Sequence, residues 1–130
     1  DKWYGFDDGH YSGARIIEML SKNEKSIAEI CNELPMLFST PELNINVTDD
    51  SKFKIIKEFA DNCRLEGEKN TIDGLRLDFE DGWGLIRASN TTPKLVLRFE
   101  GRSEEILNRI QNDFLNELTR ICPDIDINLS

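Results

Sequence analysis

The sequence predicts an α+β fold: a curved antiparallel sheet of about four strands, with two helices packed on one face and a helical segment in front. Three observations support this prediction. Short runs after residue 42 alternate apolar with polar residues, which is typical of half-buried strands. Two longer stretches repeat apolar residues at spacings of three and four, which is typical of amphipathic helices. The order strand, helix, three strands and helix favours antiparallel neighbours.

Residues 1–34 are predicted to form two helices. Asp7-Asp8-Gly9 is a turn signal that opens the first helix, which we expect to reach about Leu20. Ser26-Ile-Ala-Glu29 is a capping box, in which the serine and the glutamate each satisfy a free backbone N–H at a helix start. The second helix should stop before Pro35, because proline has no amide hydrogen with which to continue it.

Residues 35–42 are the best candidate for a linker or hinge, because the segment holds two prolines and shows little periodicity. A new domain is then expected over residues 43–130. It should open with a strand over residues 43–47, where apolar and polar residues alternate. A helix should follow, with caps offered by residues 49–51 and a core stripe of Phe53, Ile56, Ala60 and Cys63.

The middle of the domain is predicted to hold three more strands. Residues 66–70 are charged and should form a loop, and a strand should follow over residues 75–79. Asp81-Gly82 favours a tight hairpin whose central residues both have positive φ, leading into a strand over residues 83–88. The third strand should cover residues 94–100.

A long helix is predicted after the third strand. Ser103 can cap it, and its core stripe comprises Leu107, Ile110, Phe114, Leu118 and Ile121. Pro123 ends this helix. The alternating residues Ile125, Ile127 and Leu129 are candidates for a short additional edge strand.

Composition excludes several classes of function. The net charge of -9 argues against nucleic acid or an anionic membrane as a partner, and no apolar run approaches the roughly 18 residues that span a membrane. Three widely spaced cysteines indicate free thiols in a reducing, cytoplasmic compartment, and a single histidine argues against a His-rich metal site. Paired acidic residues all fall at turns or helix starts, where capping explains them. The sequence therefore offers no catalytic residue and no metal ligands.

The segment Arg87-Ala-Ser-Asn-Thr-Thr-Pro93 has the composition of a phosphate-binding loop. It lies between two predicted strands, where backbone N–H groups are free to point at a ligand. Arg87 can pair with two phosphate oxygens, while the hydroxyls of Ser89, Thr91 and Thr92 and the amide of Asn90 can donate hydrogen bonds to the others. The alternative is an ordinary polar turn with Asn90 in the left-handed region and an arginine at the end of a strand. Because the chain is acidic, an anion site also requires Arg87, Lys94 and Arg98 to gather near this loop.

The run from Asp73 to Glu100 closely resembles the C-terminal domain of the α-D-phosphohexomutases, and is most similar to the bacterial bifunctional phosphomannomutase/phosphoglucomutase branch. In that branch the loop has the sequence Arg-Ala-Ser-Asn-Thr-Thr-Pro, which residues 87–93 match at every position. Many relatives, including phosphoglucosamine mutases, carry a Ser-Gly-Thr-Glu-Pro version. The opening Gly5-Phe-Asp-Asp-Gly9 and the helix after it resemble the end of the family's third domain, so residues 1–34 would be a remnant of that domain.

This resemblance implies a function. Such enzymes interconvert hexose 1-phosphates and 6-phosphates, here of mannose and glucose, through a bisphosphorylated intermediate. An active-site phosphoserine transfers the phosphoryl group with the help of Mg²⁺, and both lie upstream of this chain in the family. The fourth domain holds the phosphate that is not reacting, which assigns that role to Arg87, Ser89, Asn90 and Thr91. The chain alone is then expected to bind no metal and to be inactive, with hexose phosphates and the remaining enzyme domains as its partners.

A second hypothesis remains open from the sequence. The chain could be a stand-alone α+β binding or regulatory module that uses its sheet face for a protein or an apolar ligand. That hypothesis predicts an exposed apolar sheet face and indifference to phosphate.

The resemblance to the phosphohexomutases also implies a motion. The family's fourth domain rotates to close the substrate cleft, which would place the hinge in residues 35–42.

Overall fold

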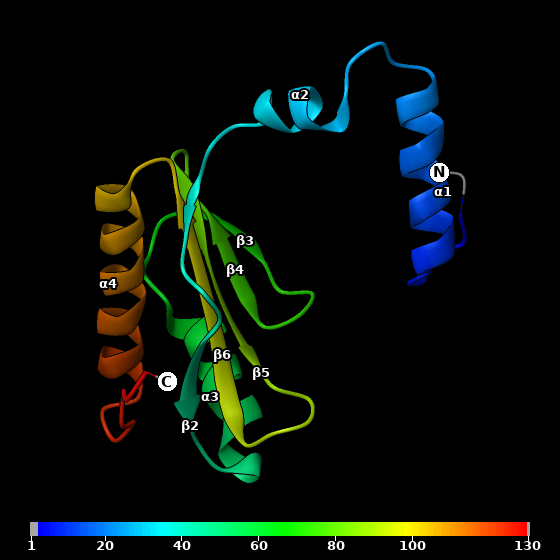
Figure 1. Cartoon of the computed structure of the whole chain (residues 1–130). Coiled ribbons are helices and arrows are strands. Elements are labelled where there is room, and N and C mark those ends of the chain that lie inside the picture. The colour runs from blue at the N-terminus through cyan, green and yellow to red at the C-terminus, as the bar shows by residue number, and fades with distance from the viewer. Residues whose placement is uncertain (1–2, 130) are drawn as a thin grey trace. The chain divides into compact units, whose positions relative to one another are not determined.

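The computed structural model describes residues 3–129, which fall into two compact units that divide between Met36 and Leu37 (Figure 1). The first unit contains helices α1 (Gly9–Ser21) and α2 (Ile27–Asn32). The second unit contains strands β1 (Phe38–Ser39), β2 (Leu43–Asn46), β3 (Glu68–Asn70), β4 (Leu75–Asp78), β5 (Gly82–Ala88) and β6 (Lys94–Gly101), and helices α3 (Asp49–Asn62) and α4 (Glu104–Ile121). None of the described helices is both long and apolar enough to cross a membrane.

The two helices of the first unit begin where the sequence predicts. The Asp8 carboxylate accepts a hydrogen bond from the Tyr11 backbone N–H at 2.9 Å, and it thereby caps α1. Ser26 and Glu29 form the predicted capping box at the start of α2. None of the residues described in this unit is buried, so it has no hydrophobic core of its own.

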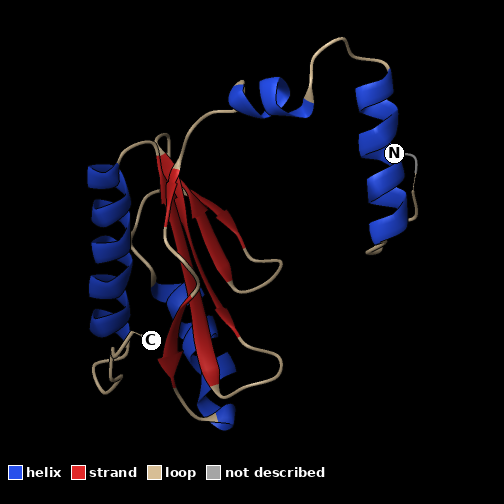
Figure 2. Ribbon diagram, viewed as in Figure 1, coloured by secondary structure: helices blue, strands red, loops and turns tan. Residues whose placement is uncertain are grey.

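The second unit is the predicted α+β fold. Its six strands form one antiparallel sheet in the order β1-β6-β5-β4-β3, with β2 also paired to β6. Helices α3 and α4 both pack against β5 and β6 and against each other, so they cover one face of the sheet (Figure 2). The opposite face carries no helix of this unit.

The hydrophobic core lies between the sheet and its two helices. The strands contribute alternate residues and the helices contribute one stripe each, as the periods of the two structures require. The Phe114 ring of α4 lies at the centre, with its centroid 5.3 Å from the Phe99 ring and 5.7 Å from the Phe59 ring. The fully buried residues include Ile45, Leu75, Leu77, Ile86, Leu95, Leu97, Ile110 and Leu118.

The sheet has six strands, whereas four were expected. The two that were not predicted are β1 and β3. Strand β1 lies inside the expected linker and pairs with Glu100 and Gly101 of β6. Strand β3 lies inside the expected charged loop and pairs with β4. Every residue of both strands is exposed, so no apolar alternation marks them in the sequence. They are held by backbone pairing at the sheet edges, which leaves no signature in the side chains.

Three finer predictions were wrong. The β4–β5 hairpin forms, but neither Asp81 nor Gly82 has positive φ, because the turn is closed instead by the Phe79 N–H donating to the Gly82 carbonyl at 2.8 Å. Residues 123–129 form no strand, and their apolar members pack against the core as irregular chain. In α3 the predicted Ile56, Ala60 and Cys63 do contact the core. Phe53 does not, because it is 60% exposed, and the fully buried ring is that of Phe59.

A polar network joins the end of α3 to α4. Glu117 accepts hydrogen bonds from the Arg120 guanidinium at 2.7 Å and from the Arg64 backbone N–H at 3.0 Å. Arg120 also donates to the Asn62 carbonyl at 2.8 Å. The hydrogen bond from Arg120, with a smaller contribution from that of Arg64, lowers the pKa of Glu117 from its ordinary 4.5 to about 2.

The Glu117→Gln substitution should reduce the free energy of unfolding by about 1–2 kcal/mol at pH 7, because it removes the charge from these hydrogen bonds. Since folding lowers the Glu117 pKa, the wild-type advantage should be complete above pH 4.5 and should shrink as the pH falls towards 2. Urea unfolding of both proteins at several pH values measures this. The exposed Glu66→Gln is the control, and an advantage that does not shrink at low pH would contradict the assignment.

Candidate functional site

The candidate loop joins the two central strands of the sheet. Arg87 and Ala88 are the last residues of β5, opposite Val96 and Leu95 of β6, so only residues 89–93 are loop. Strand alternation places Ile86 and Ala88 towards the helices and Arg87 on the opposite, open face. Arg87 is half-buried there, with a side chain that is 29% exposed.

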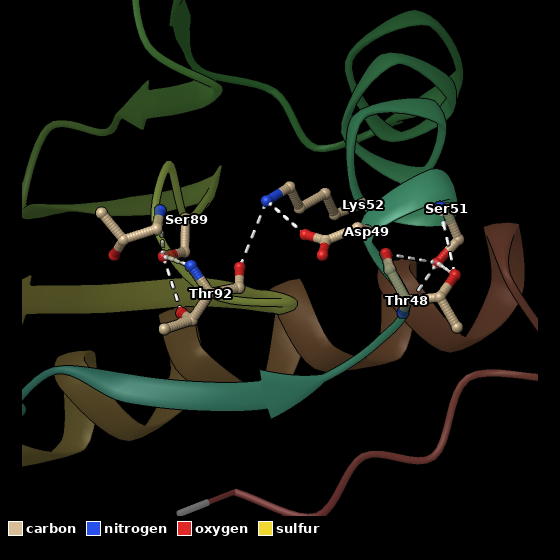
Figure 3. Close-up of polar contacts among 7 residues, drawn as sticks. Thr48, Asp49, Ser51, Lys52, Ser89 and Thr92 are labelled. Atoms are coloured by element: carbon tan, nitrogen blue, oxygen red, sulfur yellow. Dashed lines mark hydrogen bonds and ion pairs between the residues drawn. The ribbon is translucent and has the colours of Figure 1, made fainter.

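The loop is closed by its own hydrogen bonds. Ser89 is buried, and its Oγ accepts from the Thr92 backbone N–H at 3.2 Å and lies 2.8 Å from the Thr92 Oγ1 (Figure 3). A longer contact of 3.4 Å joins the Thr91 N–H to the same Oγ. The Ser89 N–H donates to the Lys94 carbonyl at 2.9 Å, and the Lys94 N–H donates to the Thr92 carbonyl at 2.8 Å. Ser89 therefore shapes the loop.

The tip of the loop remains open. Asn90 and Thr91 are exposed, and their side chains make no hydrogen bond within the part of the chain that the structure describes. Asn90 does not have positive φ, so the turn with a left-handed asparagine is excluded. The two side chains are thus available to a ligand.

A glycine turn packs directly behind Arg87. Gly74 has φ +81°, and a Cβ placed on it would lie 2.2 Å from the Ile86 carbonyl oxygen and 2.7 Å from the Arg87 Cα. The neighbouring Asp73 carboxylate lies 3.8 Å from the Arg87 guanidinium. Only glycine tolerates both this backbone conformation and this approach, so the turn fixes the position of Arg87.

Lys52 of α3 is the residue of this region that sequence analysis missed. It is only 5% exposed, and its Nζ donates to the Thr92 carbonyl at 3.2 Å and contacts Asp49 Oδ1 at 2.8 Å (Figure 3). A lysine normally breaks an apolar stripe, so hydrophobic periodicity could not reveal it. The only signal in the sequence was the acidic residue three positions earlier, at the spacing of a helical ion pair.

The cationic residues near the loop include one, Lys52, that was not predicted. Lys94 follows the loop directly, as expected. Arg98 lies four residues further along β6, two positions beyond the Val96 that pairs with Arg87, and its side chain is on the same open face as Arg87. Arg76 lines the same shallow pocket of the open face as Arg87, and it forms an ion pair with Asp78 at 2.6 Å. The cations at the loop itself are Arg87, Lys94 and Lys52, and Arg98 lies further along the open face.

No chemistry beyond binding is visible in the described residues. Within residues 3–129, no three His, Cys, Asp or Glu side chains come together in a way that could hold a metal ion. The three cysteines are free thiols, and burial raises the pKa of Cys63 and of Cys122. A raised pKa leaves less thiolate, which makes both groups poorer nucleophiles.

Comparisons of the chain with known proteins all lead to the same protein family. The family described as "Phosphoglucomutase/phosphomannomutase, C-terminal domain" matches residues 42–117. A phosphomannomutase/phosphoglucomutase of Pseudomonas putida is 50% identical over 129 residues, which are 98% of this chain and 28% of that protein. A phosphoglucomutase of Neisseria meningitidis serogroup B is 52% identical over 117 residues, which are 88% of this chain and 25% of that protein.

A solved structure is also similar. A phosphoglucomutase/phosphomannomutase family protein from Burkholderia thailandensis matches with a TM-score of 0.78 and 45% identity, over 99% of this chain and 27% of that one. The chain thus spans about 28% of the length of the curated phosphomannomutase/phosphoglucomutase relatives.

The Gly74→Ala substitution should lower the free energy of unfolding by about 1–3 kcal/mol, because it forces a side chain into positive φ and against the backbone of Arg87. The same substitution should change the chemical shifts of the Arg87 amide and Nε–Hε groups. Gly13→Ala is the control, since a Cβ at Gly13 meets no atom within 4 Å. Unchanged Arg87 signals would show that the turn does not position this arginine.

Proposed function

This chain belongs to the phosphoglucomutase/phosphomannomutase family, and from that premise we propose that Arg87 and the loop 89–93 hold the non-reacting phosphate of a hexose phosphate during reversible transfer of a phosphoryl group between positions 1 and 6. The ligands we assign are the 1- and 6-phosphates of mannose and glucose and the bisphosphorylated intermediate. The phosphate contacts would come from Arg87, Ser89, Asn90 and Thr91.

The observation that carries this proposal is the closed loop with an open tip. Hydrogen bonds of Ser89 and Thr92 fix the backbone, while the side chains of Asn90 and Thr91 remain free beside the Arg87 strand end. Ser89 can still contribute a donor, because its hydroxyl hydrogen is free whenever the Thr92 hydroxyl donates to it. A preformed loop of this kind loses little conformational entropy when an anion binds.

Such a loop suits a phosphate that does not react. Binding energy from a remote phosphate can orient the distant reacting group for transfer. Hydroxyls, an amide and one guanidinium recognise phosphate oxygens without contacting a particular sugar position. The loop can therefore accept either the 1- or the 6-phosphate, as an intermediate that turns over between two half-reactions requires.

We assign the chemical step to other parts of the enzyme. The phosphoserine would be supplied upstream of this chain, as would the ligands of the Mg²⁺ that assists transfer, so the chain alone would be inactive and would bind no metal. We also propose a cytoplasmic setting, which the three free thiols support. The other domains of the enzyme and the phosphorylated hexose would be its partners.

We further propose that residues 1–34 are the end of the preceding domain and that the hinge lies within residues 35–42. The division of the chain between Met36 and Leu37 supports this, as does a family match that starts at residue 42. Because Phe38 and Ser39 pair with β6, the freest backbone bonds of the hinge would lie before them.

The alternative of a stand-alone module that binds through its sheet face has less support. The open face carries charged side chains on its central strands, including Arg76, Asp78 and Arg87. Arg76 also covers the Trp83 ring, with its guanidinium carbon 4.1 Å from the ring centroid. The face therefore lacks the continuous apolar surface that this alternative requires.

We expect a two-dimensional amide NMR titration of the 130-residue chain with glucose 1-phosphate to shift the signals of residues 87–92, with an affinity on the order of millimolar because a single phosphate contact must offset the entropy of association. Arg87→Ala should weaken binding at least about tenfold, since it removes a charge-assisted pair. Glucose should cause no shift.

The matched control is Arg102→Ala, which removes the same charge from an exposed position just after β6, at the end of the strand opposite the loop. It should change the affinity less than about twofold, as expected for a screened surface charge. Equal losses in both variants, or shifts with glucose as well, would contradict a specific phosphate site and favour the general binding module.

Phosphate binding should weaken several-fold between pH 7 and pH 5, because the phosphate monoester loses one charge near its second pKa of about 6. A guanidinium keeps its positive charge over this range, so the change in affinity comes from the phosphate. The same titration at pH 5, 6, 7 and 8 measures this. Inorganic sulfate, whose charge is constant over the range, is the control, and a flat profile for glucose 1-phosphate would rule out recognition of the dianion.

A further inference from the structure

Lys52 is a charged residue that is almost completely buried, which is energetically costly for an ammonium group. Only 5% of the residue is exposed, and removing an ammonium from water is unfavourable unless the group is paired and hydrogen-bonded. Its Nζ contacts Asp49 Oδ1 at 2.8 Å and the Thr92 carbonyl oxygen at 3.2 Å, and lies 5.2 Å from the Phe53 ring centroid. These contacts give the ammonium group two oxygen partners and an aromatic ring nearby.

The ion pair with Asp49 does not by itself explain this burial. Asp49 is 72% exposed, and a lysine at this helical spacing could make the same pair on the surface. An apolar side chain would also fill a buried position in the first turn of α3 at lower cost. The contact that requires a buried donor is the one to Thr92, which lies forty positions away in the sequence and inside the candidate loop.

The Thr92 carbonyl is held from two directions. It accepts from the Lys52 ammonium and from the Lys94 backbone N–H at 2.8 Å. A carbonyl oxygen carries a partial negative charge that would repel a phosphate, and with two donors in place it is not free to turn towards the loop tip. The next residue, Pro93, is held as well, because its carbonyl accepts from the Val47 N–H at 3.0 Å.

We propose that Lys52 is a positioning residue of the phosphate site: its ammonium fixes the Thr92 carbonyl, keeps the loop 89–93 in its binding conformation and adds a positive charge behind it. This inference rests on the proposed function. The added charge matters because the chain has a net charge of -9, so the field that attracts an anion must be generated locally. A charge in a buried position is also screened less by salt than one on the surface.

The test compares Lys52→Met, which keeps most of the side-chain volume, with Lys52→Arg, which keeps the charge and the donors. The probe is glucose 1-phosphate, titrated into each 130-residue chain and followed by amide NMR. Lys52→Met should bind about tenfold more weakly and Lys52→Arg within about threefold of wild type, since the second variant retains a charge-assisted hydrogen bond. Lys57→Met removes the same charge from an exposed site on α3 and should bind like wild type.

Two further readouts separate positioning from simple stabilisation of the fold. Without ligand, Lys52→Met should raise the fast backbone motion of residues 90–92 above that of the rest of the sheet. In the wild type, the ¹⁵Nζ resonance of Lys52 should shift when glucose 1-phosphate is added and should stay in place with glucose. Thermal unfolding establishes that each variant is folded, and if Lys52→Met is not, Lys52→Arg and the Nζ resonance decide the question.

The outcomes distinguish this inference from the function on which it rests. If Arg87→Ala weakens binding but Lys52→Met binds like wild type, Lys52 plays no part and the proposed function stands. If glucose 1-phosphate shifts the amide signals of the loop but not the Lys52 ¹⁵Nζ resonance, the inference about Lys52 is also overturned and the proposed function stands. If the wild-type loop itself does not respond to glucose 1-phosphate, both are overturned.

Discussion

The pairing of β5 with β6 is the constraint on which the rest of this domain depends. The register runs from Gly82 opposite Gly101 to Ala88 opposite Leu95, and the candidate loop is the connection that closes it. Because side chains alternate along a strand, a slip of one residue would turn Ile86 to the open face and bury Arg87 among the helices. The register therefore determines both the composition of the core and the placement of the guanidinium.

Glycines lock this register from the core side. A Cβ on Gly84 would lie 2.5 Å from the Phe114 ring, and one on Gly101 would lie 2.7 Å from the Leu107 backbone nitrogen. Each of the two central strands thus has a position that only a residue without a side chain can occupy, and α4 packs onto both. The helix can approach the sheet this closely in one register only. Packing of Phe114 and the position of Arg87 are therefore consequences of the same pairing.

Sequence patterns could predict the parts of this structure that side chains specify. The alternation in β4, β5 and β6 and the stripe of α4 follow from burial. The composition of the loop led to the hypothesis of a phosphate site. Strands β1 and β3 were hidden because their backbone pairs while their side chains stay in solvent. Lys52 was hidden for the opposite reason, since a buried lysine violates the polarity rule on which periodicity depends. That Ser89 bonds to its own loop could be seen only from the hydrogen bonds in the structure. Composition does not reveal whether a hydroxyl faces a ligand or its own loop.

Hydrogen bonds within the loop determine its shape, and the side chains at its tip remain open to a ligand, with Ser89 able to take part in both. Ser89 and Thr92 close the turn, while Lys52 of α3 and Val47, the residue after β2, hold the carbonyls of Thr92 and Pro93. This arrangement answers the problem that an acidic chain poses for an anion site. Charges on exposed side chains are screened within about 10 Å, so distant acidic residues contribute little to the field at the loop. A half-buried arginine and a buried lysine act at short range and in a medium of lower dielectric, where each charge counts for more. An acidic domain can therefore present a site for phosphate without being basic as a whole.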